Sequence, residues 1–157
     1  MLLQTLFHSH VGGLLRRSHW AFPILECVHI YSIIALMGLA AAFDLRLIGL
    51  SVYMERRSIA EVAKTTWRWA WVPLTVIVAT GSLMFVSNAP RYAANPAFLL
   101  KISLVAVAVV YHVGLVLWGR RYEARVGGAL TLAFGVSALL LWVGVVVSSR
   151  WIAYSYA

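Results

Sequence analysis

Four long apolar segments dominate the pattern along the chain. They cover about residues 22–43, 69–86, 97–118 and 129–147, and short polar stretches separate them. Each is close to the ~20 residues that a helix needs to cross ~30 Å of hydrocarbon. None alternates apolar and polar residues as a barrel strand does, and an open strand edge has no partner in lipid. The pattern predicts an all-α integral membrane protein, a four-helix transmembrane bundle that forms one domain over residues 1–157.

Two shorter patterns lie outside the four segments. Residues 1–18 combine leucines and a phenylalanine with histidine and arginine, which predicts an N-terminal amphipathic helix in the membrane interface, weakened at Gly12 and Gly13. Residues 58–61, Ser-Ile-Ala-Glu, have the form of a capping box. They predict a short helix that runs toward Trp67 at the membrane surface.

Composition agrees with this class and changes the meaning of the charge. Hydrophobic residues make up 62% of the chain and charged residues 11%, which excludes a soluble globule. The net charge of +8 would indicate nucleic acid for a soluble protein. Here the basic residues lie at the segment ends, where they orient the chain and meet anionic lipid, so we expect the bilayer and no nucleic acid as partner.

The same basic residues predict the orientation. Eight lie around the first and third connections, and five lie around the termini and the second connection. In a bacterial inner membrane this modest bias puts both termini in the periplasm and places Arg56, Arg57, Arg120 and Arg121 in the cytoplasm.

Two histidines lie deep in these segments, where an unpartnered imidazole is costly. Counted from Trp20 and from Lys101, His29 and His112 are nine and eleven residues along, or ~14 and ~16 Å at ~1.5 Å per residue. The first and third segments run parallel in an up-down bundle and lie diagonally across it. We therefore predict that His29 and His112 bind the iron of a single b-type haem (haem b) from opposite sides.

Other polar and small residues extend this predicted site. Glu26 shares a helix face with His29, and we predict that it pairs with Lys101 or accepts a hydrogen bond from Nδ1 of His29. Lys101 or Arg91 is predicted to pair with a haem propionate. Each segment also has a glycine that would leave room for the macrocycle: Gly38, Gly81, Gly114 and Gly135.

Three functions stay open on the sequence alone. The first is a one-haem electron-transfer subunit that takes electrons from quinol or from a redox partner. The second is a proton or ion path, or a small transporter, that uses Glu26, His29, Lys101 and His112. The third is a membrane anchor without catalysis that recruits or assembles a partner. The alternative to haem binding is an interhelical hydrogen bond from His29 to Thr80 or Ser32, which would satisfy a neutral imidazole. No hydrolytic triad, phosphate-binding glycine loop or acidic pair is visible, so an electron-transfer role is favoured over independent catalysis.

Several short motifs together resemble a known group of proteins. They are residues 20–29 (WAFPILECVH), 44–49 (DLRLIG), 80–81 (TG) and 95–101 (NPAFLLK), followed by His112. This set resembles an uncharacterised family of bacterial four-span inner-membrane proteins and covers most of the chain. The resemblance implies a bacterial membrane protein and makes Asp44 and Arg46 positions to test beside the residues above. A looser architectural likeness is to four-helix membrane b-type cytochromes, many of which carry four histidines, whereas this chain has two deep ones.

Overall fold

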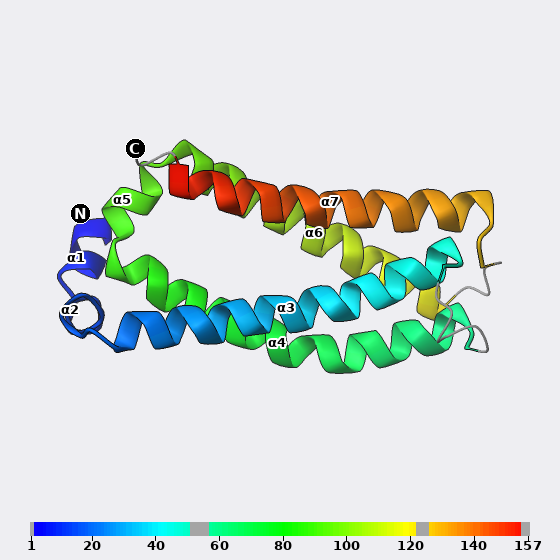
Figure 1. The fold of residues 1–157 in the computed structure, drawn as a ribbon, viewed down its shortest axis with the longest axis horizontal. Helices are drawn as coiled ribbons and strands as arrows, with labels where there is room; N and C mark the ends of the chain where they lie inside the picture. Colours follow the sequence, from blue (N-terminus) through cyan, green and yellow to red (C-terminus); the bar gives the residue numbers. More distant parts are fainter. Residues whose placement is uncertain (1, 51–56, 122–125, 155–157) are drawn as a thin grey trace.

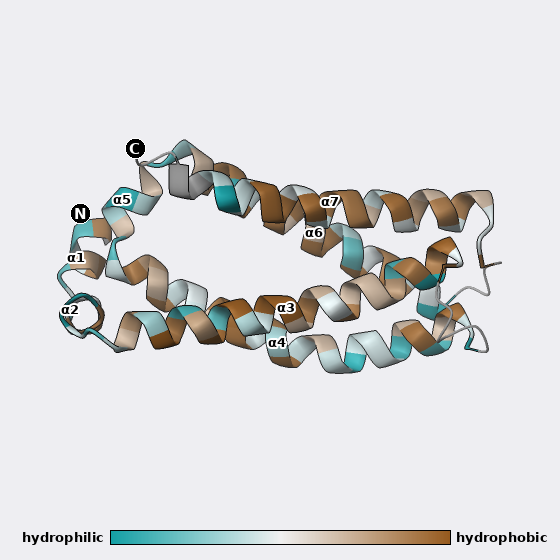
Figure 2. Ribbon diagram, in the orientation of Figure 1, coloured by the Kyte–Doolittle hydropathy of each residue, from teal (hydrophilic) through white to brown (hydrophobic). Residues whose placement is uncertain are grey.

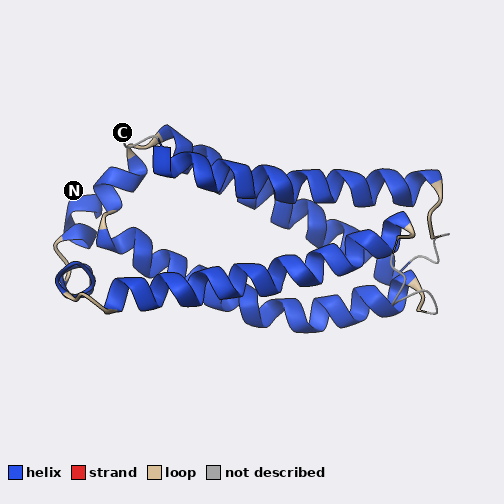
Figure 3. Cartoon of the chain, viewed as in Figure 1, coloured by secondary structure: helices blue, strands red, loops and turns tan. Residues whose placement is uncertain are grey.

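The computed structural model describes residues 2–50, 57–121 and 126–154, and within them every regular element is a helix (Figures 1 and 3). The helices are α1 (Leu2–Phe7), α2 (His10–Arg17), α3 (Ala21–Ile48), α4 (Ile59–Ser87), α5 (Ala89–Ala93), α6 (Pro96–Arg121) and α7 (Ala129–Tyr154).

Four of these helices, α3, α4, α6 and α7, are long and apolar enough to cross a membrane. At ~1.5 Å per residue, the 28 residues of α3 measure about 42 Å. This exceeds the ~30 Å of the hydrocarbon core, so the helix ends reach the polar interface. Figure 2 shows apolar residues over most of their length, with the first half of α4 paler. The predicted all-α four-span bundle is confirmed.

The packing of the long helices gives the bundle its arrangement. Helix α3 packs against α4 and α7, and α6 packs against the same two helices, so α3 and α6 lie diagonally as predicted. All four helices contribute to one buried cluster near the end where α3 stops and α4 starts: Phe43, Leu47, Ile59, Val62, Ala63, Leu115, Val116 and Ala138.

A glycine allows a close crossing of two helices at this end. A Cβ on Gly135 of α7 would lie 2.7 Å from the Asp44 carbonyl oxygen and 2.7 Å from Ile48 Cγ1. Only a residue without a side chain lets the two backbones approach so closely. Gly135 therefore fits the structure as a packing residue between α3 and α7.

The opposite end of the bundle carries α1, α2 and α5 (Figure 1). The predicted amphipathic helix is two helices, because the chain turns at Ser9, whose side chain accepts a hydrogen bond from the Gly12 amide and caps α2. Arg16 of α2 donates to the Ser87 carbonyl of α4 at 2.8 Å and to the Phe7 carbonyl of α1 at 2.7 Å. These two hydrogen bonds hold α1 and α2 against the bundle.

Two connections differ from or refine the sequence prediction. The capping box forms, with the Ser58 hydroxyl accepting from the Glu61 amide and the Glu61 carboxylate accepting from the Ser58 amide. The helix that it opens is not a short surface helix, because it continues without a break into the second span and ends at Ser87. Before α6, the Asn95 side chain accepts from the Ala97 and Phe98 amides, and Pro96 takes the first helical position, where no amide donor is needed.

Candidate functional site

Within residues 2–50, 57–121 and 126–154, the most deeply buried ionisable side chain is that of Asp44 on α3, which is 0% exposed. Its Oδ1 lies 3.5 Å from Nδ1 of His112 on α6, and His112 is 9% exposed. Asp44 stands one turn before the end of α3, whereas His112 stands nine residues before the end of α6. The pair thus connects the two diagonal helices through the interior of the bundle.

Apolar and aromatic groups enclose this pair. The ring of Phe43 meets the His112 imidazole edge to face, with centroids 5.7 Å apart, and the Trp142 indole of α7 does so at 6.0 Å. The cluster around Phe43 lies on one side of the pair. On the other side Trp142 packs with Ala40 and Ala108, which are one turn before Asp44 and His112. The pair therefore has a low-polarity surrounding in which net charge is expensive.

This surrounding decides what the pair can do. An ionised aspartate beside a protonated imidazole has no net charge, and neither has a protonated aspartate beside a neutral imidazole. Both states hold the same single proton, and a buried pair with zero net charge costs far less than a lone buried ion. Asp44 and His112 can therefore hold one proton that moves between an oxygen and a nitrogen.

His29 has a different environment at a different level. Its Nδ1 lies 2.7 Å from Oγ1 of Thr80 on α4. The Thr80 hydroxyl donates its hydrogen to the Val76 carbonyl at 2.6 Å, so Nδ1 of His29 is the donor in the contact between the two side chains. Gly81 makes room for the ring, because a Cβ there would come within 3.2 Å of His29 Cε1. The interhelical bond to Thr80, one of the alternatives from the sequence, is confirmed.

Glu26 lies within electrostatic range of His29, as their shared helix face predicted, and so does Lys101 of α6. Neither predicted contact of Glu26 forms. Among the residues that the structure describes, no ion pair joins Glu26 to Lys101, and Nδ1 of His29 faces Thr80 rather than Glu26. The reason is that Glu26 is exposed on its helix whereas His29 turns toward α4. The prediction of a direct partner for Glu26 is wrong.

The two histidines are not brought together. His112 is level with Asp44, and fifteen residues of α3 separate His29 from Asp44, which is about 22 Å at ~1.5 Å per residue. The predicted equal depth assumed that Lys101 stands at the interface as Trp20 does, but Lys101 lies near the level of His29. One iron cannot contact both imidazoles in this arrangement, so the geometry gives no support to the predicted haem between them.

The remaining predicted residues are also apart from the pair. Arg91 is exposed on α5 at the end of the bundle, and Gly38 and Gly114 would have nothing within 4 Å of an added Cβ. No group of three or more histidine, cysteine, aspartate or glutamate side chains that could hold a metal ion occurs in the described part of the chain.

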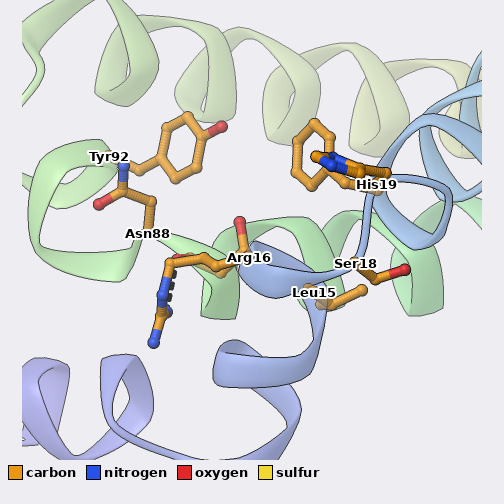
Figure 4. A pocket seen from close by; sticks show the side chains of 8 residues that line it. Leu15, Arg16, Ser18, His19, Asn88 and Tyr92 are labelled. Carbon is orange, nitrogen blue, oxygen red and sulfur yellow. Dashed lines mark hydrogen bonds between the residues drawn. The ribbon is translucent and has the colours of Figure 1, made fainter.

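An open surface hollow of about 340 Å³ lies at the end of the bundle where α2, α3, α4 and α5 meet (Figure 4). It is lined by Leu15, Arg16, Ser18, His19, Phe22, Ser87, Asn88 and Tyr92. Phe22 shares a face of α3 with Glu26 and His29, at spacings of four and three residues. Phe22 thus places this hollow about two turns of α3 before His29.

Comparison with known proteins places the chain in a protein family. A model of a family of unknown function, DUF6644, matches residues 6–155. The chain belongs to this family. No curated protein and no solved structure matches it. Membership in an uncharacterised family is confirmed, whereas the motifs and the bacterial source stay predictions.

Sequence reasoning named Asp44 only through the resemblance and did not pair it with His112. It missed Trp142 altogether. A signal was present only for Trp142, because its indole N–H is a polar group inside the fourth apolar segment. Asp44 comes directly after the first segment, 22–43, and lies inside a helix only because α3 continues to Ile48. The signal at Trp142 does not say which side chain is the partner, since the helix offsets come only from packing.

Proposed function

We propose that this protein moves protons across the membrane, either alone or coupled to a small solute, and that Asp44 and His112 form the site where the proton is held. The observation that carries the proposal is the fully buried carboxylate with an imidazole nitrogen 3.5 Å away, inside a membrane bundle. Ionisable residues in spanning helices are costly and mark proton relays more often than packing positions.

The polar residues Glu26 and His29 extend the proposal toward the other end of the bundle. The hollow beside Phe22, the exposed Glu26 and the half-buried His29 would bring protons from the aqueous side. Between His29 and the buried pair, the helices are lined by apolar side chains that include Ala40 and Ala108. This apolar layer would act as the barrier that a coupled carrier needs, because an uninterrupted proton pathway would dissipate the proton gradient.

The predicted one-haem electron-transfer subunit is the weaker candidate. It requires two imidazoles on one iron, and His29 and His112 lie about 22 Å apart in level. Only this electron-transfer candidate requires a quinone or another redox partner. Its test is an absorption spectrum of the protein purified from haem-replete cells. A Soret band that is lost in both His29→Ala and His112→Ala would overturn the proton proposal in favour of the haem.

The decisive experiment measures proton flux in proteoliposomes. The protein is reconstituted with a pH-sensitive dye inside the vesicles, and a potassium diffusion potential drives protons inward. We expect Asp44→Asn and His112→Gln each to reduce the protein-dependent acidification at least tenfold, because neither amide can hold the shared proton. His10→Gln is the matched control, since His10 is exposed on α2, and it should retain the full rate.

Two outcomes would overturn the proposal. One is wild-type flux no greater than that of empty vesicles, both with the potential alone and with candidate solutes present. The other is full flux in an Asp44→Asn variant that circular dichroism shows to be folded.

The orientation in the membrane belongs to the same proposal. The basic residues Arg57, Arg120 and Arg121 favour a cytoplasmic position for the end of the bundle that holds the pair, in a bacterial inner membrane.

A further inference from the structure

Five buried polar atoms of the pair and of the neighbouring Trp142 have no hydrogen-bond partner in the protein. They are Oδ1 and Oδ2 of Asp44, Nδ1 and Nε2 of His112 and Nε1 of Trp142. Each of these atoms is shielded from the exterior, and Trp142 itself is 8% exposed. Buried polar atoms in native proteins almost always have a partner, either protein or ordered water, because an unmade hydrogen bond is costly.

The three side chains belong to one layer of the bundle. Asp44 and His112 are in contact at 3.5 Å, which is longer than a good hydrogen bond between nitrogen and oxygen. The Trp142 and His112 rings meet with centroids 6.0 Å apart. Trp142 also packs against Ala40 and Ala108, the residues one turn before the pair on α3 and α6. The alanine side chains carry no polar atom, so they offer no hydrogen-bond partner to the carboxylate, the imidazole or the indole N–H.

We propose that a buried water molecule occupies this layer and bridges Asp44, His112 and Trp142. The donors and acceptors select the ligand. The indole Nε1–H can only donate, the carboxylate chiefly accepts, and a neutral imidazole has one atom of each kind. Water accepts two hydrogen bonds and donates two, so it matches all three groups. A cation is opposed by the indole N–H, and an anion is opposed by the Asp44 carboxylate.

Trp142 is the positioning residue of this site. Its N–H donates to one lone pair of the water oxygen, which leaves the second lone pair for the protonated partner. One water hydrogen then points to the acceptor atom of the other partner, either a carboxylate oxygen of Asp44 or the unprotonated nitrogen of His112. A proton then passes from the protonated partner to the water as the water gives one of its own protons to the other partner, with no net change in the water. The transfer step rests on the proposed function, whereas the water site itself does not.

The experiment is pH-difference infrared spectroscopy on the reconstituted protein in ordinary water and in water labelled with oxygen-18. We expect a buried-water O–H stretching band that shifts with the isotope and is lost in Trp142→Phe. Trp151→Phe is the matched control, because Trp151 is exposed on the same helix, and it should retain the band. Absence of an isotope-sensitive band in the wild-type protein, or its persistence unchanged in folded Trp142→Phe, would overturn the water site.

A second variant covers the case in which Trp142→Phe fails to fold. Asp44→Asn keeps the size of the side chain but weakens the acceptor, so the band should move in frequency, and an unmoved band would count against the site. The flux assay separates this inference from the proposed function. An isotope-sensitive band that depends on Trp142, together with no proton flux, would leave a structural water and remove the transport proposal.

Discussion

At the residue scale, the two deep histidines show how similar positions in a membrane helix acquire different chemistry. His29 donates to a threonine hydroxyl that is itself engaged with its own helix, so it joins α3 to α4. His112 faces a buried carboxylate at 3.5 Å and an indole, and in the proposed function it shares a proton with the acid. The hydroxyl partner supports a role in helix association, and the carboxylate partner supports a role in proton binding.

The role of His29 leads to a stability prediction. We expect Thr80→Val to lower the free energy of unfolding by about 1 kcal/mol, because an interhelical hydrogen bond in a membrane contributes roughly 0.6–2 kcal/mol. Thr75→Val is the control, since the Thr75 hydroxyl is exposed and donates to the Trp71 carbonyl of the same helix. Unfolding in mixed detergent, followed by circular dichroism, measures both. Equal losses in the two variants would show that the bond to His29 contributes nothing.

At the element scale, the crossing of α3 and α7 fixes the level at which Asp44 enters the core. The Gly135 backbone touches the last turn of α3, and Leu47 lies 3.1 Å from the place of its missing Cβ. A shift of α7 along or away from α3 would move Trp142 relative to the pair. The glycine thus links helix packing to the geometry of the site.

Gly135→Ala tests that link. We expect it to destabilise the protein by about 1–3 kcal/mol, because an added methyl group overpacks a close contact with backbone. Gly144→Ala on the same helix has nothing within 4 Å of the new Cβ, so alanine there should be neutral or stabilising by up to about 1 kcal/mol. The same unfolding assay compares them. If both variants were neutral, α3 and α7 would not approach each other as closely as described.

At the scale of the whole molecule, the four spans bring the N-terminal helices and the last turns of α7 to one end (Figure 1). The pair lies toward the opposite end, where α3 stops and α4 begins. A proton entering beside Phe22 would therefore cross most of the bundle before it reached Asp44. In the proposed function, this asymmetry makes the orientation of the protein in the membrane decide which side the pair exchanges protons with.

The orientation can be measured with reporter fusions. We expect alkaline phosphatase to be active when fused at the C-terminus and inactive when fused after Arg121, because the positive-inside bias places the basic α6 end in the cytoplasm. A fluorescent protein should show the reverse pattern. Fluorescence of the C-terminal fusion together with an inactive phosphatase would invert the orientation without changing the fold. Arg56, which is part of the predicted bias, lies outside the described residues.

The sequence by itself determined the elements. Hydrophobic runs of spanning length left helices as the only structure that satisfies the backbone in lipid, and short connections imposed the up-down order. The capping box at Ser58 was readable because it is local. What the sequence could not supply was helix length beyond the apolar core, since interfacial turns such as those before Trp67 have no strong pattern.

Tertiary structure alone decided the site. Helical periodicity placed Glu26 with His29 and Lys101 with His112 on shared faces, but it carries no information on how far one helix is shifted along another. That offset comes from side-chain packing between helices, through contacts such as Gly135 with the Asp44 backbone. It separated His29 from His112 and set Asp44 and Trp142 beside His112, because depth in a bundle is fixed by contacts between helices and not by counting along one of them.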